Sequence, residues 1–172
     1  MSLVPLHHAS DAITQTFNRW NNDPKIVHLI RPSRSEEELK AIHELSTEDL
    51  EKRLDTHDIF LIYADDQLVG EVNTMYNPSH LYHKEPGSAW LGLVIGEAIG
   101  RGKGVGTEAL RLLEAHLRRK GTPRIELGVF EFNEAAYRLY QKMGYHEIGR
   151  VEDFTYWRGK LWADIRMEKR LD

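Results

Sequence analysis

The chain has 172 residues, of which 41% are hydrophobic and 29% charged, and its formal net charge at pH 7 is -4. This length and composition predict one folded domain over residues 1–172 and argue against intrinsic disorder. The acidic balance argues against non-specific nucleic-acid binding, and the absence of cysteine excludes disulfides, thiolate metal sites and cysteine nucleophiles.

The first third of the chain predicts one short strand followed by helices whose boundaries are loosely defined. Turn-forming residues at 21–24 end the first helix, and a second turn-rich stretch follows at 31–35. The candidate segments are Leu3–His8 as a strand, Ser10–Trp20 as a helix capped by Ser10 or Asp11, Glu36–Ile42 as a helical stretch, and Ser46–Leu54 as a helix with a capping start.

The remaining two thirds predict clearer elements. Asp65-Asp66 is a hairpin signal, and Ala89–Gly96 is apolar on both faces, so we expect that strand to be central and buried. The predicted order is strands Ile59–Ala64, Gln67–Tyr76 and Ala89–Gly96, helix Gly104–Lys120, strand Arg124–Phe130, helix Asn133–Met143, and strands Tyr145–Tyr156 and Leu161–Leu171. This order predicts an α/β fold with a mixed central sheet of about seven strands and about four flanking helices.

A glycine-rich basic loop stands between the central strand and the helix that follows it. Glycines at 102, 104 and 106 would let an anion approach the main chain closely, because no Cβ intrudes. The start of a helix also carries unpaired backbone N–H groups and partial positive charge. Arg101 and Lys103 add positive charge, so the loop predicts a binding site for a phosphorylated cofactor.

Two familiar phosphate-binding patterns fit this loop poorly. The P-loop pattern fails because Lys103 is followed by Gly104 and not by Ser or Thr. The dinucleotide fingerprint is matched by Gly104, Gly106 and Ala109, but the preceding strand ends near Gly96, well before the first of these glycines. A nicotinamide-type site therefore remains only as a weak alternative.

A third pattern, [QR]-x-x-G-x-[GA], is matched in full by Arg101–Gly106, between a strand and a helix. This segment resembles the acetyl-CoA loop of the GNAT superfamily of N-acetyltransferases. Asn133–Tyr145 is similar to the second motif of that family, N-x-x-A-x-x-x-Y-x-K-x-G-[FY]. The predicted order of elements also matches the GNAT order, so the resemblance extends over nearly the whole chain.

Within the superfamily, the chain most resembles the RimJ/RimL-like branch of ribosomal-protein, spermidine and aminoglycoside acetyltransferases. Arg19–Pro24 is similar to the W-x-x-D-P signature of that branch. Ile148–Leu171 is similar to its C-terminal hairpin, with Asp164 at the usual acidic position.

The resemblance implies a GNAT-type fold and transfer of an acetyl group from acetyl-CoA to a primary amine. Protein N-termini, polyamines, aminoglycosides and other small amines all remain open as acceptors, and we expect the first half of the chain to select among them. A homodimer is an open possibility. The alternative function is a non-catalytic acyl-CoA-binding module used for sensing or assembly.

The resemblance also implies roles for individual residues. The strand that ends at Gly96 would hold the pantetheine arm, and a backbone N–H near Val94 or Ile95 could polarise the thioester carbonyl. Tyr140 would protonate the leaving thiolate. The expected cofactor-binding set is Val94, Ile95, Gly96, Arg101, Gly102, Lys103, Gly104, Val105, Gly106, Thr107 and Asn133.

The general base cannot be chosen from the sequence. Glu97 ends the central strand, Glu71 shares a strand face with Asn73, and His83 lies in a polar loop that could cover the acceptor. A water chain is a further possibility. His80-x-x-His83 is a weak metal pair because no further ligand set accompanies it, so we expect no metal.

No apolar run approaches the ~20 residues that a membrane-spanning helix needs. The first residues also lack the basic stretch and apolar core of a signal peptide. We therefore expect a cytoplasmic protein without a membrane or nucleic-acid partner.

Overall fold

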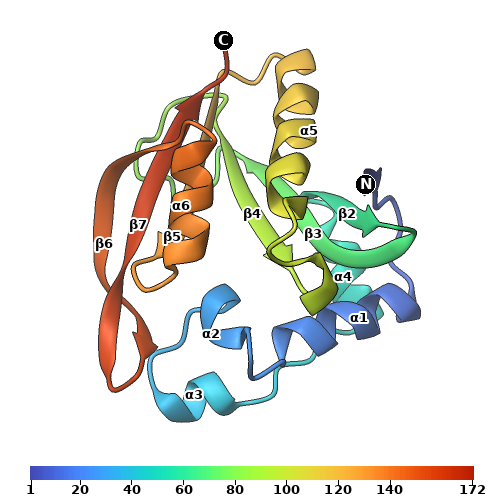
Figure 1. Cartoon of the computed structure of the whole chain (residues 1–172), viewed down its shortest axis with the longest axis vertical. Coiled ribbons are helices and arrows are strands. Elements are labelled where there is room, and N and C mark those ends of the chain that lie inside the picture. Colours follow the sequence, from blue (N-terminus) through green and yellow to red (C-terminus); the bar gives the residue numbers. More distant parts are fainter.

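A computed structural model describes residues 1–172 as one mixed sheet with helices on both faces (Figure 1). No helix combines the length and the apolar character that crossing a bilayer requires. In chain order, the elements are β1 (Ser2–Pro5), α1 (Asp11–Asn21), α2 (Val27–Ile30), α3 (Glu36–Lys40), α4 (Thr47–Arg53), β2 (Asp58–Ala64), β3 (Gln67–Tyr76), β4 (Ala89–Ile95), the 3₁₀ turn η1 (Ala98–Gly100), α5 (Val105–Arg119), β5 (Arg124–Phe130), α6 (Glu134–Lys142), β6 (His146–Trp157) and β7 (Lys160–Arg170).

The sheet has seven strands in the order β1-β2-β3-β4-β5-β7-β6, and only the β4–β5 pair is parallel. That pair is joined over three positions, from Ala89 opposite Ile125 to Leu91 opposite Leu127. Beyond these positions the two strands diverge, as Figure 1 shows. The backbone edge of β4 from Gly92 to Ile95 therefore has no strand partner on its β5 side.

Helices α5 and α6 cover the face of the sheet that is turned toward the viewer in Figure 1, called here the front face. The apolar stripe of α5 buries Leu110, Leu113 and Leu117 completely against the sheet. The helix α6 begins where the Asn133 side chain accepts a hydrogen bond from the Ala136 amide at 3.3 Å. The apolar residues of α5 and α6 pack against the sheet in the larger hydrophobic core of the molecule.

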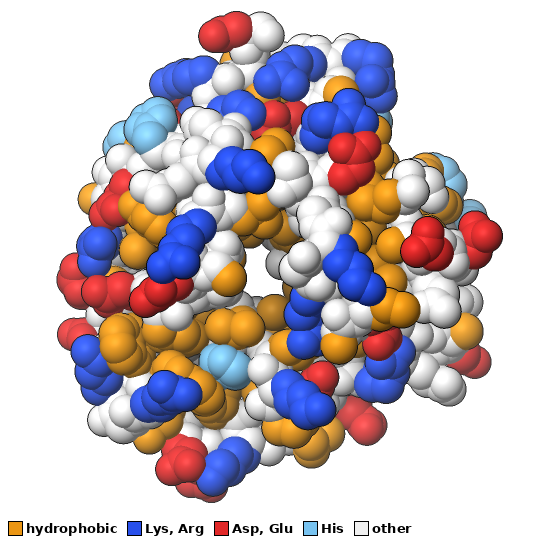
Figure 2. All heavy atoms as spheres, in the orientation of Figure 1, with side chains coloured by type: hydrophobic (Ala, Val, Ile, Leu, Met, Phe, Trp, Pro, Cys, Tyr) orange, Lys and Arg blue, Asp and Glu red, His pale blue; other side chains and the backbone are white.

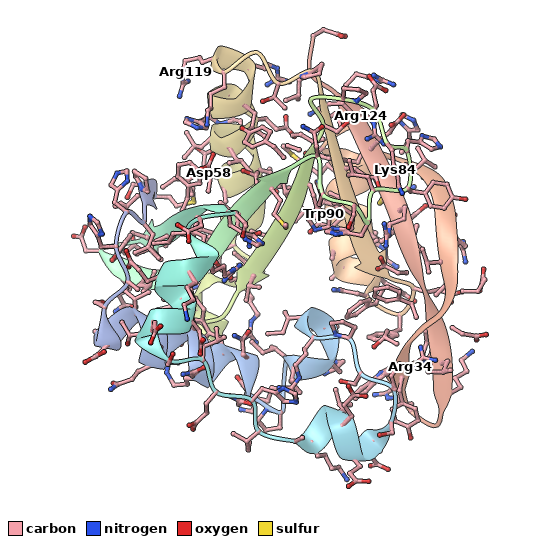
Figure 3. The ribbon with its side chains drawn as sticks, turned by 180° about the vertical axis from the view of Figure 1, so that it is seen from behind. Arg34, Asp58, Lys84, Trp90, Arg119 and Arg124 are labelled. Carbon is pink, nitrogen blue, oxygen red and sulfur yellow. The ribbon has the colours of Figure 1, made fainter.

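Helices α1 and α4 pack on the opposite face, called here the back face, which Figure 3 shows. Their apolar residues form a second, smaller core in which Phe17, Trp20 and Leu50 contact Ile59 and Leu61 of β2. Capping residues start these helices as expected: Ser10 caps α1, and Ser46 with Asp49 forms a capping box at α4.

The first half of the chain contains one short helix, α2, that the sequence did not predict. The sheet has the expected seven strands, but six α-helices flank it where about four were expected. The helix that was not expected is the short α2, whereas α3 lies within the expected helical stretch Glu36–Ile42. The strand β1 ends at Pro5, where a strand to His8 was expected. Helices of one turn carry too little periodicity to be recognised in a sequence.

The segment between α2 and α3 ties the first half of the chain to the last hairpin. The Tyr156 amide donates to the Ser33 carbonyl at 2.7 Å, and the Ser33 amide donates to the Thr155 hydroxyl at 3.0 Å. The Arg34 guanidinium also donates to the carbonyl of Asp153. Because β6 is an edge strand, this segment covers part of its outer edge and bridges the open end of the diverging strands (Figure 1).

Candidate active site

The divergence of β4 and β5 leaves a cavity of about 600 Å³, called here the central cavity. Its front side is lined by residues of α6, including Asn133 at the helix start and Tyr140, and its back side by Arg53 of α4 and Glu71 of β3. Figure 2 shows its front mouth as a hollow near the centre of the molecule. The central cavity therefore passes between two strands and reaches side chains on both faces of the sheet.

The glycine loop lies at the beginning of α5 beside this cavity. Gly102 and Gly104 have φ angles of 69° and 78°, and a Cβ at either position would point into open space. The first amide that bonds back into the helix is that of Glu108, to the Gly104 carbonyl at 3.0 Å. The amides of Val105, Gly106 and Thr107 therefore have no helical acceptor, and together with the helix dipole they are suited to bind an anion.

Arg101 and Gly106 have structural roles beside this loop. The Arg101 guanidinium donates to the carbonyls of Ile95 and Gly96, at 3.1 and 2.8 Å, and so fixes the loop against the end of β4. A Cβ at Gly106 would lie 3.1 Å from a methyl carbon of Leu139, so this glycine lets α6 approach α5. Lys103, by contrast, is exposed.

The predicted strand residues do not all face the central cavity. Val94 and Ile95 line it, on the part of β4 that has no partner on the β5 side. Gly96 lies beyond them against the ring of Trp20, where any Cβ would overlap the indole. Gly96 therefore serves the packing of α1 on the sheet, while Val94 and Ile95 present backbone to the cavity.

Tyr140 is 6% exposed and lines the cavity from the front side. Its ring meets the Tyr145 ring edge-on, with centroids 5.8 Å apart. Burial raises the pKa of Tyr140 well above that of a free phenol. The phenol therefore stays protonated throughout the neutral range and is available as a proton donor.

Glu71 is 7% exposed on the back side of the same cavity. Both terminal nitrogens of Arg53 donate to its Oε1 at 3.2 Å, while the buried Oε2 has no hydrogen-bond partner. Burial raises the pKa of this carboxyl, and the Arg53 charge opposes that shift. Glu71 therefore presents one free carboxylate oxygen beside Val94, its neighbour in the β3–β4 pairing.

Asp164 on β7 is a second buried carboxylate of the central cavity, 3% exposed. Its Oδ2 accepts from the Arg166 Nε at 2.8 Å, and burial raises its pKa against the opposing charge of Arg166. The carboxylate occupies the space that a Cβ at Gly128 would need. Nothing in the spacing of Gly128 and Asp164 in the sequence indicates that they meet.

Glu97 and His83 lie outside the lining of the central cavity. The Glu97 carboxylate accepts from Arg19 at 2.6 Å and from the Trp20 indole at 2.8 Å, and these bonds lower its pKa. The His83 ring is about half exposed and lies 3.9 Å from Glu168. Of the three candidate bases, Glu71 alone is in contact with the cavity.

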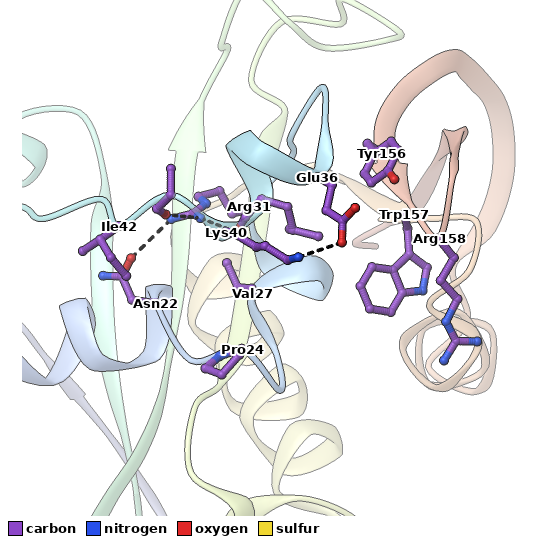
Figure 4. Close-up of a pocket in the computed structure, with 12 residues that line it drawn as sticks. Asn22, Pro24, Val27, Arg31, Glu36, Lys40, Ile42, Tyr156, Trp157 and Arg158 are labelled. Carbon is purple, nitrogen blue, oxygen red and sulfur yellow. Dashed lines mark hydrogen bonds and ion pairs between the residues drawn. The ribbon is translucent and has the colours of Figure 1, made fainter.

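A second cavity of about 510 Å³ lies on the other side of α2 (Figure 4). It is lined by Val27 of α2, by Lys40 of α3, and by Trp157 and Arg158 at the tip of the last hairpin. None of the residues predicted to act in catalysis or cofactor binding lines it. The short helix α2 is thus a wall between the two cavities, with Leu29 and Ile30 on the side of the central cavity.

Comparison with known proteins assigns the chain to one protein family. A model described as the acetyltransferase (GNAT) family matches residues 18–145. The chain is also 51% identical over 45 residues to YdgE of Bacillus subtilis, an uncharacterised N-acetyltransferase, and this match spans 26% of the chain and 29% of that relative.

Solved structures share the fold at low sequence identity. A ribosomal-protein-alanine N-acetyltransferase from Brucella melitensis superposes with a TM-score of 0.72 at 20% identity, over 95% of this chain and 98% of the other. A spermidine N-acetyltransferase from Vibrio cholerae, in complex with CoA and spermine, gives 0.72 at 21% identity, over 99% and 95% of the two chains. These likenesses establish the fold expected from the sequence.

Proposed function

The chain belongs to the GNAT family of acetyl-CoA-dependent N-acetyltransferases, and on this premise we propose that residues 1–172 form a single domain that acetylates a primary amine by direct attack. One observation carries the proposal. The central cavity joins an anion site and a buried phenol on the front side to a buried carboxylate on the back side. Acetyl-CoA and an amine can therefore meet between the diverging strands.

The acetyl-CoA side is supported by groups that suit a diphosphate and an extended arm. The free amides of residues 105–107 and the open space over Gly102 and Gly104 suit the diphosphate. The unpaired edge of β4 at Val94 and Ile95 offers backbone hydrogen bonds to the pantetheine arm and to the thioester oxygen. The side-chain oxygen of Asn133 caps α6, so its side-chain NH2 group is left to donate a hydrogen bond to the pantetheine arm.

In the proposed reaction, the neutral amine nitrogen attacks the thioester carbonyl carbon. A carbon–nitrogen bond forms, the carbon–sulfur bond breaks, and the products are the N-acetyl amine and free CoA thiol. The nitrogen loses one proton to Oε2 of Glu71, directly or through one water, and the sulfur gains one proton from the phenol of Tyr140.

The raised pKa of Tyr140 is compatible with this donation. The same burial that disfavours a phenolate also disfavours a thiolate in the cavity, so the pKa of the leaving group rises with that of its donor. Proton transfer from oxygen to sulfur as the carbon–sulfur bond breaks then yields the free thiol, and the negative charge passes to the phenol oxygen. The proton is regained from solvent after the products leave.

Glu71 is a better base than the other two candidates for two physical reasons. It lines the cavity, and its raised pKa makes the carboxylate a stronger base toward the nitrogen that must lose the proton. Glu97 lies outside the cavity, and its bonds to Arg19 and Trp20 make the carboxylate less basic. His83 is on the surface of the far loop.

The competing function is a non-catalytic module that binds acyl-CoA. Such a module would need the anion site and the free edge of β4, but not a buried carboxylate with a free oxygen opposite a buried phenol. The presence of both Glu71 and Tyr140 in one cavity favours the enzyme.

A thiol-release assay with acetyl-CoA over a panel of amines tests the proposal. We expect amine-dependent release of CoA thiol and a mass increase of one acetyl group on the acceptor. Tight acetyl-CoA binding by calorimetry, combined with thiol release that no amine accelerates, would favour the binding module. Absence of acetyl-CoA binding would contradict both functions.

A further inference from the structure

The back side of the central cavity has mainly apolar walls. Short helix α2 and the segment after it contribute aliphatic side chains, and the strands contribute aromatic rings from the other side. The wall residues that matter for the acceptor are Leu29, Ile30, Pro32, Trp90, Phe130 and Phe154. Apolar walls exclude water, and they stabilise a bound apolar group of the ligand by removing its surface from solvent.

The two carboxylates on this side are already neutralised by arginines. Glu71 is held by Arg53 at 3.2 Å, and Asp164 by Arg166 at 2.8 Å. A polyamine or an aminoglycoside would bring several positive charges into the cavity, where no unpaired carboxylate remains to compensate them. Moving such charges out of water is costly without partners, so the lining disfavours polycationic acceptors.

Lys25 adds a positive charge at the opening of the central cavity. It lies in the loop between α1 and α2, lines the central cavity, and is exposed at its rim. Its backbone amide bonds to the Asp23 carboxylate at 2.9 Å, but its ammonium forms no salt bridge within the chain. An unpaired ammonium at the rim of an apolar pocket suits an anionic group on the ligand.

We propose that the acceptor is a small α-amino acid with an apolar side chain. Its amine faces Glu71, its side chain lies among the apolar walls, and its carboxylate pairs with Lys25. This inference rests on the proposed acetyl transfer and narrows it to one class of amine. An amino acid brings a single amine and one carboxylate, which Lys25 can pair, so it enters such a lining at a lower desolvation cost than a polycation.

The size of the cavity agrees with this class. About 600 Å³ must hold both the reacting end of acetyl-CoA and the acceptor, which leaves room for a small molecule. A peptide N-terminus would present an amide where the amino acid presents its carboxylate, and Lys25 would then have no anionic partner. Comparing an amino acid with its own amide, with rates expressed per concentration of neutral amine, therefore isolates the contribution of Lys25.

The experiment measures kcat and KM for L-leucine, L-methionine and L-phenylalanine, for their amides, and for spermidine and kanamycin. We expect the apolar amino acids to be the best acceptors, and each to exceed its amide about fivefold in kcat/KM expressed per neutral amine, the range of an exposed ion pair. Lys25→Ala should remove this preference by raising KM for the acids while leaving kcat and the amides unchanged. Lys25→Glu should reverse the preference.

Lys84→Ala is the matched control, because Lys84 is an exposed lysine on the loop between β3 and β4 and lies outside the cavity lining (Figure 3). It should leave the acid-to-amide ratio unchanged. Better turnover of spermidine or kanamycin than of any amino acid would overturn the substrate class while leaving acetyl transfer intact. An unchanged ratio in Lys25→Ala would also overturn it, whereas failure of every amine would instead contradict the proposed function.

Discussion

The two sides of the central cavity are built in different ways. On the side proposed for acetyl-CoA, the candidate binding groups are mostly backbone amides and carbonyls from one stretch of chain, residues 94–107. On the acceptor side, they are side chains from α4, β3 and β7, brought together from positions as distant as Arg53 and Asp164. The first side depends on local backbone conformation, and the second on tertiary packing.

This difference predicts how each side responds to substitution. A backbone site keeps its donors whatever the side chains are, so it is lost only when a new side chain fills the space. A site built from side chains loses its catalytic function when a single functional group is removed, even when the fold is intact. Substitutions on the two sides should therefore separate acetyl-CoA affinity from turnover.

The largest expected effect is the loss of acetyl-CoA binding in Gly104→Glu. The new side chain would enter the open space over the loop and add negative charge beside a diphosphate. Gly121→Glu is the matched control, because Gly121 also has a positive φ, of 76°, and open space around it, but lies at the other end of α5. Calorimetric titration with acetyl-CoA should detect binding in the control and none in Gly104→Glu; comparable affinities would remove the loop from the site.

The next largest effect is expected for Glu71→Gln, which removes the base but keeps the shape of the side chain. We expect kcat/KM to fall about 1000-fold, within the range of general-base catalysis, with acetyl-CoA affinity unchanged. Glu97→Gln and His83→Ala are the controls and should stay within about twofold, because neither residue lines the cavity. A larger loss in Glu97→Gln than in Glu71→Gln would reassign the base.

Tyr140→Phe should lower kcat about 100-fold and leave the Kd of acetyl-CoA unchanged, because only the proton donor is lost. Tyr137→Phe controls for the loss of a tyrosine hydroxyl on the same helix, since that hydroxyl bonds to Glu147 outside the cavity. Single-turnover measurement of thiol release compares the two variants. Equal rates in Tyr140→Phe and in the unchanged protein would exclude Tyr140 from the chemistry.

The smallest effect concerns pH. Burial raises the pKa of Glu71, and a base must be ionised to act, so kcat/KM should fall as the pH drops through that raised pKa. The decline should reach about tenfold for each pH unit below it, and its midpoint should lie above the ~4.3 of an ordinary glutamate. The Glu71→Gln profile isolates the separate titration of the amine, and an identical acid limb in both proteins would contradict the assignment.

The backbone features of the side proposed for acetyl-CoA were largely predictable from the sequence because their signals are local. Glycines that tolerate a positive φ, a helix that starts after them, and Asn133 as an N-cap all act within a few residues of chain. Their spacing specifies the backbone shape that the site uses. The strand alternation of β6 and β7 and the hairpin at Asp65-Asp66 were readable for the same reason.

The acceptor side could not be predicted, because each of its contacts joins distant parts of the chain. The sequence offered Glu71, Glu97 and His83 on equal terms, and only packing put Arg53 against the first, Arg19 against the second and solvent around the third. Likewise, Asp164 meets Gly128 because β5 and β7 are neighbours in the sheet. A pKa depends on such surroundings and not on residue type alone.

The sequence by itself indicated the family, through the resemblance of Arg101–Gly106 and Asn133–Tyr145 to the motifs of that family. It also predicted the order of the strands along the chain and the glycine loop, since these depend on periodicity, capping and glycine geometry over short stretches. Tertiary structure alone decided where β4 and β5 diverge, which carboxylate is buried with a free oxygen, and that Lys25 remains unpaired at the rim. Burial and charge compensation are set by what the whole chain packs around a residue.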